Sequence, residues 1–198
     1  MTHSLHRQGD LKDLKRDYVI LAMLASEFND NTPESRENLL RVAKILTDSK
    51  PSNMMPEFAW KVSSVITAVY DDIKSVKMVL TRLKAEDLGI SIVVSGLISE
   101  VKELLDEVGL NIHTVHLSLG VFGKKELLPK KKEILEITTM CGHHCISPQS
   151  VEYYVDLIKN GKISIEKAAE KLAKPCICGI FNISRAIEIL NQLVKIKN

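Results

Sequence analysis

All four cysteines of this 198-residue chain fall into two pairs near its C-terminus. The pairs are Cys141-Gly-His-His-Cys145 and Pro175-Cys-Ile-Cys178-Gly, and thirty residues separate them. Ser147-Pro148 is typical of a helix start, and the chain then has room for one helix of about 12 residues and a second of about ten, which travel about 18 Å out and about 15 Å back. An antiparallel helix pair would therefore gather the four thiols, with His143 and His144, in one small volume.

Such a thiol cluster indicates a metal site, because thiolates in a low-dielectric setting repel one another unless a soft cation neutralises them. The irregular spacing, with Gly and Pro beside the thiols, favours an iron–sulfur cluster such as [4Fe–4S]. Zinc is the alternative, although Cys176-Ile-Cys178 is tighter than an ordinary zinc knuckle. The predicted ligands are Cys141, His143, Cys145, Cys176 and Cys178.

Two other interpretations of the cysteines remain open. Free cysteines are often buried simply as small hydrophobic side chains. Alternatively, Cys141 is a catalytic thiol activated by His143, since a Cys–His pair can form a nucleophile.

The first 140 residues alternate between apolar runs with strand character and amphipathic segments with helical spacing. This order predicts an α/β domain over residues 1–140, with a mostly parallel sheet flanked by helices, and a helical appendage over residues 141–198. The appendage is expected to contain a helix ending at Asn160-Gly161, a second over 165–174, and a third that starts at Asn182 or Ser184. The expected strands are 18–24, 63–70, 90–94, 113–119 and 134–140, and the expected helices are 34–48, 71–87 and 97–108.

In a parallel sheet Cys141 would follow the last strand at its carboxyl end, where open α/β sheets bind their ligands. Two glycine-containing loops are expected at the same edge, together with a basic run that suits a small anionic ligand. The candidate ligand-binding residues are Ser95, Gly96, Gly120, Gly123 and Lys124. An N-terminal arm with His3, His6 and Arg7 could fold over this crevice, whereas His113 and His116 would point to opposite faces of their strand.

Composition and missing motifs exclude several classes. A formal charge of +2 gives little attraction to phosphate, so we do not expect nucleic acid as a partner. No apolar run reaches the roughly 18–20 residues that span a bilayer, and no secretory signal is visible, which indicates a cytoplasmic protein with reduced cysteines and no membrane partner. The commonest nucleotide-binding and hydrolase motifs are absent.

The tail motifs Cys141-Gly-His and Pro175-Cys-Ile-Cys-Gly resemble those of a family of uncharacterised proteins from anaerobic archaea and bacteria. The resemblance extends to Leu5-His-Arg7, Asp17-Tyr-Val19, Val94-Ser-Gly96 and Ser118-Leu-Gly120, which cover most of the chain. It implies an anaerobic setting, but no activity. Because the family motif has no cysteine at the position of Cys145, the resemblance also implies that His143 is the fourth ligand.

Together these features predict a metal-binding protein of anaerobic metabolism, with redox or Lewis-acid chemistry at the cysteines. A redox partner protein is a further expected contact. The alternatives are a redox- or metal-sensing transcriptional regulator and a zinc-stabilised interaction scaffold. The sequence does not decide whether the site is catalytic or structural, nor the oligomeric state.

Overall fold

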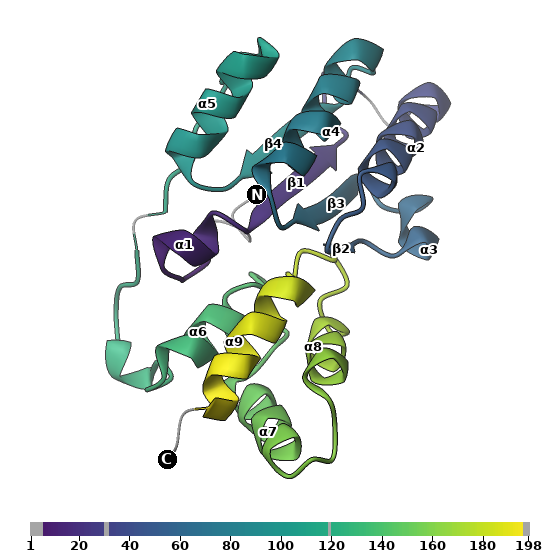
Figure 1. Cartoon of the computed structure of the whole chain (residues 1–198). Coiled ribbons are helices and arrows are strands. Elements are labelled where there is room, and N and C mark those ends of the chain that lie inside the picture. Colours follow the sequence, from purple (N-terminus) through teal and green to yellow (C-terminus); the bar gives the residue numbers. More distant parts are fainter. Residues whose placement is uncertain (1–5, 30–31, 119, 196–198) are drawn as a thin grey trace.

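The computed structural model describes residues 6–29, 32–118 and 120–195, and it consists of a small sheet with helices on either side (Figure 1). The sheet contains β1 (Tyr18–Met23), β2 (Asn53–Met54), β3 (Val65–Tyr70) and β4 (Ser91–Ser95) in the order β2-β3-β1-β4. Every neighbouring pair of strands is antiparallel. The prediction of a mostly parallel sheet is therefore wrong.

The position of β1 explains this error. Strands β3 and β4 are joined through helix α4 (Ile73–Glu86) and run in the same direction, as in a parallel unit. However, β1 lies between them and is antiparallel to both, pairing Val19 with Val69 on one side and with Ser95 on the other. The order of elements along the chain does not reveal that an earlier strand is inserted.

One face of the sheet carries its own helices. The side chains of Tyr18, Ile20 and Ala22 alternate along β1 toward this face, as expected for a strand whose successive side chains point to opposite sides. They pack with helices α2 (Pro33–Asp48), α4 and α5 (Ile98–Val108). The short helices α1 (Leu11–Leu14) and α3 (Glu57–Trp60) lie at the margins of the sheet.

The remaining helices form a second layer, below the sheet in Figure 1. This helical layer consists of α6 (Lys132–Thr138), α7 (Pro148–Lys159), α8 (Ile165–Ala173) and α9 (Ile183–Lys195), and a short 3₁₀ turn, η1 (Lys125–Leu127), precedes it. Its apolar core includes Val19 and Val69 from the opposite face of the sheet. The expected helices after residue 147 are confirmed, with Ser147 and Ser164 capping α7 and α8.

Two expected strands are not found. Residues 134–140 belong mostly to α6, because Ile134, Ile137 and Met140 are buried at a spacing of three, which suits one helix face rather than a strand. Cys141 therefore follows a helix and not the carboxyl end of a parallel strand. Residues 113–118 have no regular secondary structure, since they pair with no neighbouring strand, and Leu119 lies outside the described residues.

Candidate metal-binding site

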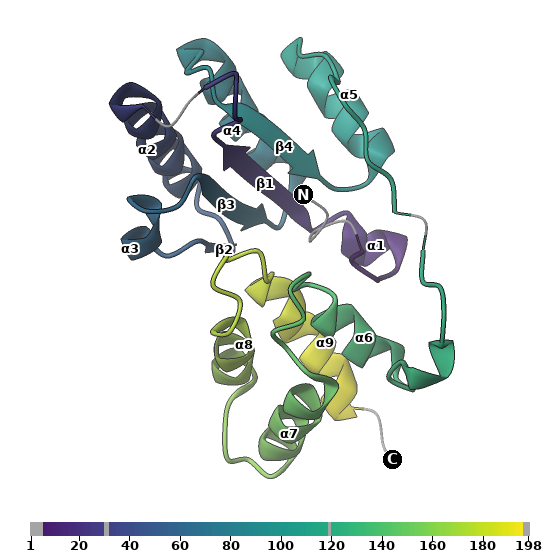
Figure 2. The same cartoon turned by 180° about the vertical axis from the view of Figure 1, so that it is seen from behind.

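Two loops of the helical layer carry the cysteines. The first joins α6 to α7 and holds Cys141 and Cys145, and the second joins α8 to α9 and holds Cys176 and Cys178. Seen from behind (Figure 2), the second loop passes beside β2, so both the helical layer and the sheet border this region. The prediction that helices α7 and α8 bring the two loops together is confirmed by the thiol contacts.

The four thiols form a chain of contacts. Cys176 Sγ lies 3.5 Å from Cys178 Sγ, and it also hydrogen-bonds with the thiol of Cys141. The Cys145 thiol hydrogen-bonds with Cys141 in turn. Cys141 and Cys176 are buried, Cys178 is half-buried, and Cys145 is exposed, so one end of the chain of thiols reaches the surface.

The first loop is a tight turn wrapped around Cys141. The backbone N–H of His144 donates to the Cys141 carbonyl oxygen at 3.1 Å, and His144 itself has a left-handed conformation with a φ of 55°. The N–H groups of His143 and Cys145 both donate to Cys141 Sγ. Backbone donors aimed at sulfur stabilise a thiolate, which is the form that binds metals.

The second loop is seated on the sheet through Cys178 and Gly179. Thr67 of β3 donates its hydroxyl hydrogen to the Cys178 carbonyl oxygen, and the N–H of Ile180 donates to Cys178 Sγ. Gly179 has a φ of 68° and lies against the backbone of Met54, so that a Cβ atom there would overlap the Met54 carbonyl group. His143 Nδ1 lies 3.7 Å from Cys178 Sγ and links the two loops.

These contacts divide the cysteines into thiolates and a thiol. Hydrogen bonds from Cys176 lower the pKa of Cys141 to about 5 and that of Cys178 to about 6. The pKa of Cys176 is raised because its proton is held between these two sulfurs. Desolvation and the nearby Cys141 raise the pKa of Cys145. Near neutral pH the cluster therefore holds two thiolates in contact with a third sulfur, an arrangement that attracts a soft cation.

The predicted ligands thus lie together: Cys141, His143, Cys145, Cys176 and Cys178 share contacts across the two loops. They do not surround one point, because among residues 6–29, 32–118 and 120–195 no group of three or more His, Cys, Asp or Glu side chains is arranged to hold an ion. The contacts are those of free thiols, sulfur to sulfur.

The predicted ligand-binding residues lie elsewhere and are not brought together. Ser95 and Gly96 line a cleft of about 880 Å³ along β4, together with residues 110–118 and Arg7 of the N-terminal arm. Gly120, Gly123 and Lys124 lie beyond this cleft in an exposed loop. Binding of a small anion at any of these residues stays a prediction.

The histidines singled out in the sequence also differ in position from what we expected. His113 and His116 both line the cleft, so the argument that they point to opposite faces of a strand does not hold. His6 Nδ1 lies 3.2 Å from Ser118 Oγ, which places the N-terminal arm against the end of segment 110–118. His3 lies outside the described residues.

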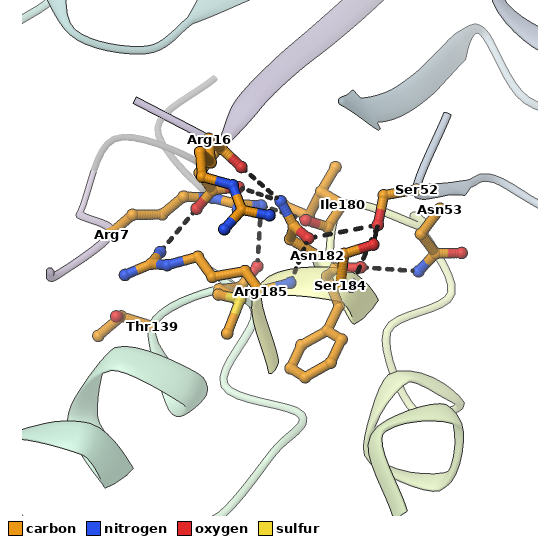
Figure 3. Close-up of polar contacts among 12 residues, drawn as sticks. Arg7, Arg16, Ser52, Asn53, Thr139, Ile180, Asn182, Ser184 and Arg185 are labelled. Carbon is orange, nitrogen blue, oxygen red and sulfur yellow. Dashed lines mark hydrogen bonds and ion pairs between the residues drawn. The ribbon is translucent and has the colours of Figure 1, made fainter. Parts of the chain in front are cut away.

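Sequence reasoning missed a buried polar network beside the cysteine loops, shown in Figure 3. Asp17 is fully buried at the start of β1 and forms ion pairs with Arg7 and with Arg185 of α9. Asn182, at the start of α9, donates from its side chain to Asp17 Oδ1 at 3.2 Å. One signal was available: an aspartate directly precedes a strand whose side chains are buried on both faces, where a charge needs a partner.

The comparisons with known proteins identify no relative. No protein-family model matches the chain, and neither a curated protein nor a solved structure matches it. In the part of the chain that the structure describes, no helix has the length and apolar character needed to cross a membrane.

Proposed function

We propose that this protein binds a single thiophilic metal ion, zinc or iron, through Cys141, Cys145, Cys176 and Cys178. The observation that supports the proposal is the chain of thiol contacts, supplied by two loops thirty residues apart and backed by N–H donors to Cys141 and Cys178. Buried cysteines that serve only as small hydrophobic side chains do not need backbone donors aimed at their sulfur atoms.

The separation of the sulfurs favours one ion over an iron–sulfur cluster. With a metal–sulfur bond of about 2.3 Å, two thiolates on a tetrahedral ion lie about 3.8 Å apart. The observed distance between Cys176 Sγ and Cys178 Sγ is 3.5 Å. A cluster places its own iron and sulfide atoms between the thiolates, so Cys176 and Cys178 within the second loop would have to move apart to hold it.

The donor set fits such an ion in its chemistry, because thiolates are the ligands that zinc and iron prefer in sites of this kind. When bound, the ion supplies Lewis acidity, and in the case of iron also redox chemistry. The protein contributes the thiolates at Cys141 and Cys178, whose charge is stabilised by N–H donors, and it keeps Cys176 away from water. An ion there would replace the sulfur-to-sulfur contacts of the free thiols.

The position of the loops supports a structural role for the ion. The first loop belongs to the helical layer, and the second is fixed to the sheet through Thr67 and Met54. A metal bound to both loops would therefore fasten the helical layer to the sheet. The exposed side chain of Cys145 leaves one ligand at the surface, where a metal can enter and leave.

The test is to purify the protein without oxygen and to measure zinc, iron, copper and acid-labile sulfide. We expect about one zinc or iron ion per chain, no sulfide, and loss of the ion in a Cys176→Ser variant. Sulfide with broad visible absorption would replace the single ion by an iron–sulfur cluster. A folded protein that retains no metal, even after incubation with zinc or ferrous iron, would overturn the proposal.

The proposed metal binding requires a reducing environment, since oxidised thiols do not bind metal. The cytoplasm of an anaerobic organism meets this requirement, and we propose it as the location. The same metal analysis on protein exposed to air should show metal loss, which a thiol reductant together with added metal reverses.

A further inference from the structure

The guanidinium group of Arg7 connects the two cysteine loops. It donates from Nη2 to the carbonyl oxygen of Met140 at 3.2 Å and to that of Ile180. Met140 directly precedes Cys141, and Ile180 follows Cys178 by two residues. A single side chain from the N-terminal arm therefore bridges the two backbone segments that carry the thiols (Figure 3).

The third contact of Arg7 anchors this bridge to the sheet. Its Nη1 forms an ion pair with Asp17 Oδ1, and the two side chains are 5% and 0% exposed. Asp17 also binds Arg185 Nη1 at 2.7 Å. The position of the Arg7 guanidinium is thus fixed by a buried carboxylate that has its own second partner.

The chemistry of the contact requires arginine. A guanidinium group is planar and offers five N–H donors in a fixed fork, so it can bind a carboxylate and two carbonyl oxygens at once. A lysine at this position keeps the charge for Asp17 but has one nitrogen on a flexible stem. It cannot hold Met140 and Ile180 at a set distance from each other.

We propose that Arg7 is a positioning residue for the metal site. Docking of the N-terminal arm sets the distance between the two cysteine loops, and this rests on the proposed metal-binding function. Residues that orient ligands without touching the metal typically change its affinity by about 10- to 100-fold when they are removed. Metal affinity should therefore depend on a residue more than 130 positions before the first cysteine.

The test compares Arg7→Lys and Arg7→Ala with Arg16→Ala in the full chain. Arg16 is a matched control, because its ion pair with Glu188 is exposed and contacts neither cysteine loop. Zinc affinity is measured by competition with a chelator, and cobalt spectra report the ligand geometry. We expect affinity to fall at least tenfold in both Arg7 variants and to stay unchanged in Arg16→Ala.

Chemical rescue separates positioning from a general loss of stability. Millimolar guanidinium chloride should restore part of the zinc affinity of Arg7→Ala, whereas the same concentration of sodium chloride should not. If Arg7→Ala and Arg7→Lys both bind zinc like the wild type, Arg7 has no positioning role. The same conclusion follows if affinity falls only in step with the stability of the metal-free protein and guanidinium has no effect.

Hydrogen exchange in the metal-free protein tests the role of Arg7 independently of whether the protein binds a metal. The amides of Cys141–Ile146 and Cys176–Ile180 should exchange faster in Arg7→Lys than in the wild type, and Arg16→Ala should show no change. Unchanged exchange in both loops overturns the role of Arg7 even if the wild type binds zinc. Faster exchange with no zinc binding in the wild type would instead leave the loop bridge standing and reject the metal site.

Discussion

His143 and His144 are adjacent in the same turn but differ in their contacts. His143 Nδ1 reaches Cys178 Sγ, whereas His144 provides the left-handed backbone conformation that the turn needs. The family resemblance implies that His143 is a metal ligand, whereas the proposed site uses Cys145, whose thiol contacts that of Cys141. In the proposed site His143 is instead a hydrogen-bond partner of Cys178.

Substitutions in this turn distinguish the two roles. We predict that His143→Asn lowers zinc affinity about tenfold, as for other hydrogen-bond partners of metal ligands. Cys145→Ser should lower it further, because it removes a ligand, and His144→Asn should have little effect, because Asn tolerates a left-handed backbone. Chelator competition on the three variants measures the order. Stoichiometric zinc in Cys145→Ser, with none in His143→Asn, would make His143 the ligand.

Gly179 and Gly161 form a second matched pair of residues. Their φ values are 68° and 66°, so alanine at either position is strained by roughly 1–2 kcal/mol. Only at Gly179 does the added Cβ also meet the backbone of Met54, while at Gly161 it meets nothing within 4 Å. We predict that Gly179→Ala destabilises the protein by at least about 1 kcal/mol more than Gly161→Ala. Denaturant unfolding measures both; equal losses would show that the loop does not depend on this close contact.

At the scale of elements, local pattern was a reliable guide to strands with buried neighbours. The runs beginning at Tyr18, Ser63 and Ile90 do form β1, β3 and β4, since continuous or β-branched apolar residues suit a strand inside a sheet. Pattern failed for residues 113–119, where the alternation is present but the described part of the segment pairs with no strand. A strand requires a partner, and its sequence does not say whether one is available.

Helix α6 is the second expected strand that is not found, for a different reason. Its β-branched residues favour a strand, but packing against α7 and α9 buries Ile134 and Ile137 and overrides that preference. The same packing also buries Glu136, which is unfavourable for a carboxylate. Burial raises the pKa of Glu136 above the ordinary 4.5. A raised native pKa means that the native state binds a proton more tightly than the unfolded chain. Stability therefore falls as pH rises through the range between the two values, and the penalty is fully present near neutral pH.

We predict that Glu136→Gln stabilises the protein at about pH 7, because the amide removes the buried charge at little change in shape. The advantage should shrink toward zero near pH 4, where the native carboxyl is already protonated. Thermal unfolding of both proteins at the two pH values measures this, with Glu133→Gln on the same helix as the control. A variant that is less stable than the wild type at neutral pH would mean that the Glu136 charge is compensated by Arg185.

At the scale of the whole molecule, the candidate site was predictable and its setting was not. Two helices of known rise return the chain to its starting point, so the meeting of Cys141 with Cys176 follows from counting residues. The bridge through Arg7 and Asp17 joins the N-terminal arm and β1 to α9, which follows them by more than 160 residues. No local pattern encodes such a contact, because it depends on how the sheet and the helical layer are placed together.

Asp17 is where these three parts of the chain meet, so its removal should affect all of them at once. In Asp17→Asn the guanidinium groups of Arg7 and Arg185 stay buried without their shared carboxylate. Leaving a buried charge uncompensated typically costs about 3–5 kcal/mol, whereas breaking an exposed pair costs about 0–1 kcal/mol. We therefore predict that Asp17→Asn lowers the free energy of unfolding by that larger amount, and that Glu188→Gln, whose partner Arg16 is exposed, lowers it only slightly.

Urea unfolding measures the stability of both variants. Trp60 fluorescence follows the sheet side, and circular dichroism follows the helices. Coincident transitions that shift together are expected if the network joins the layers into one cooperative unit. A circular dichroism transition that shifts while the Trp60 transition stays in place would show that the surroundings of Trp60 unfold independently of Asp17.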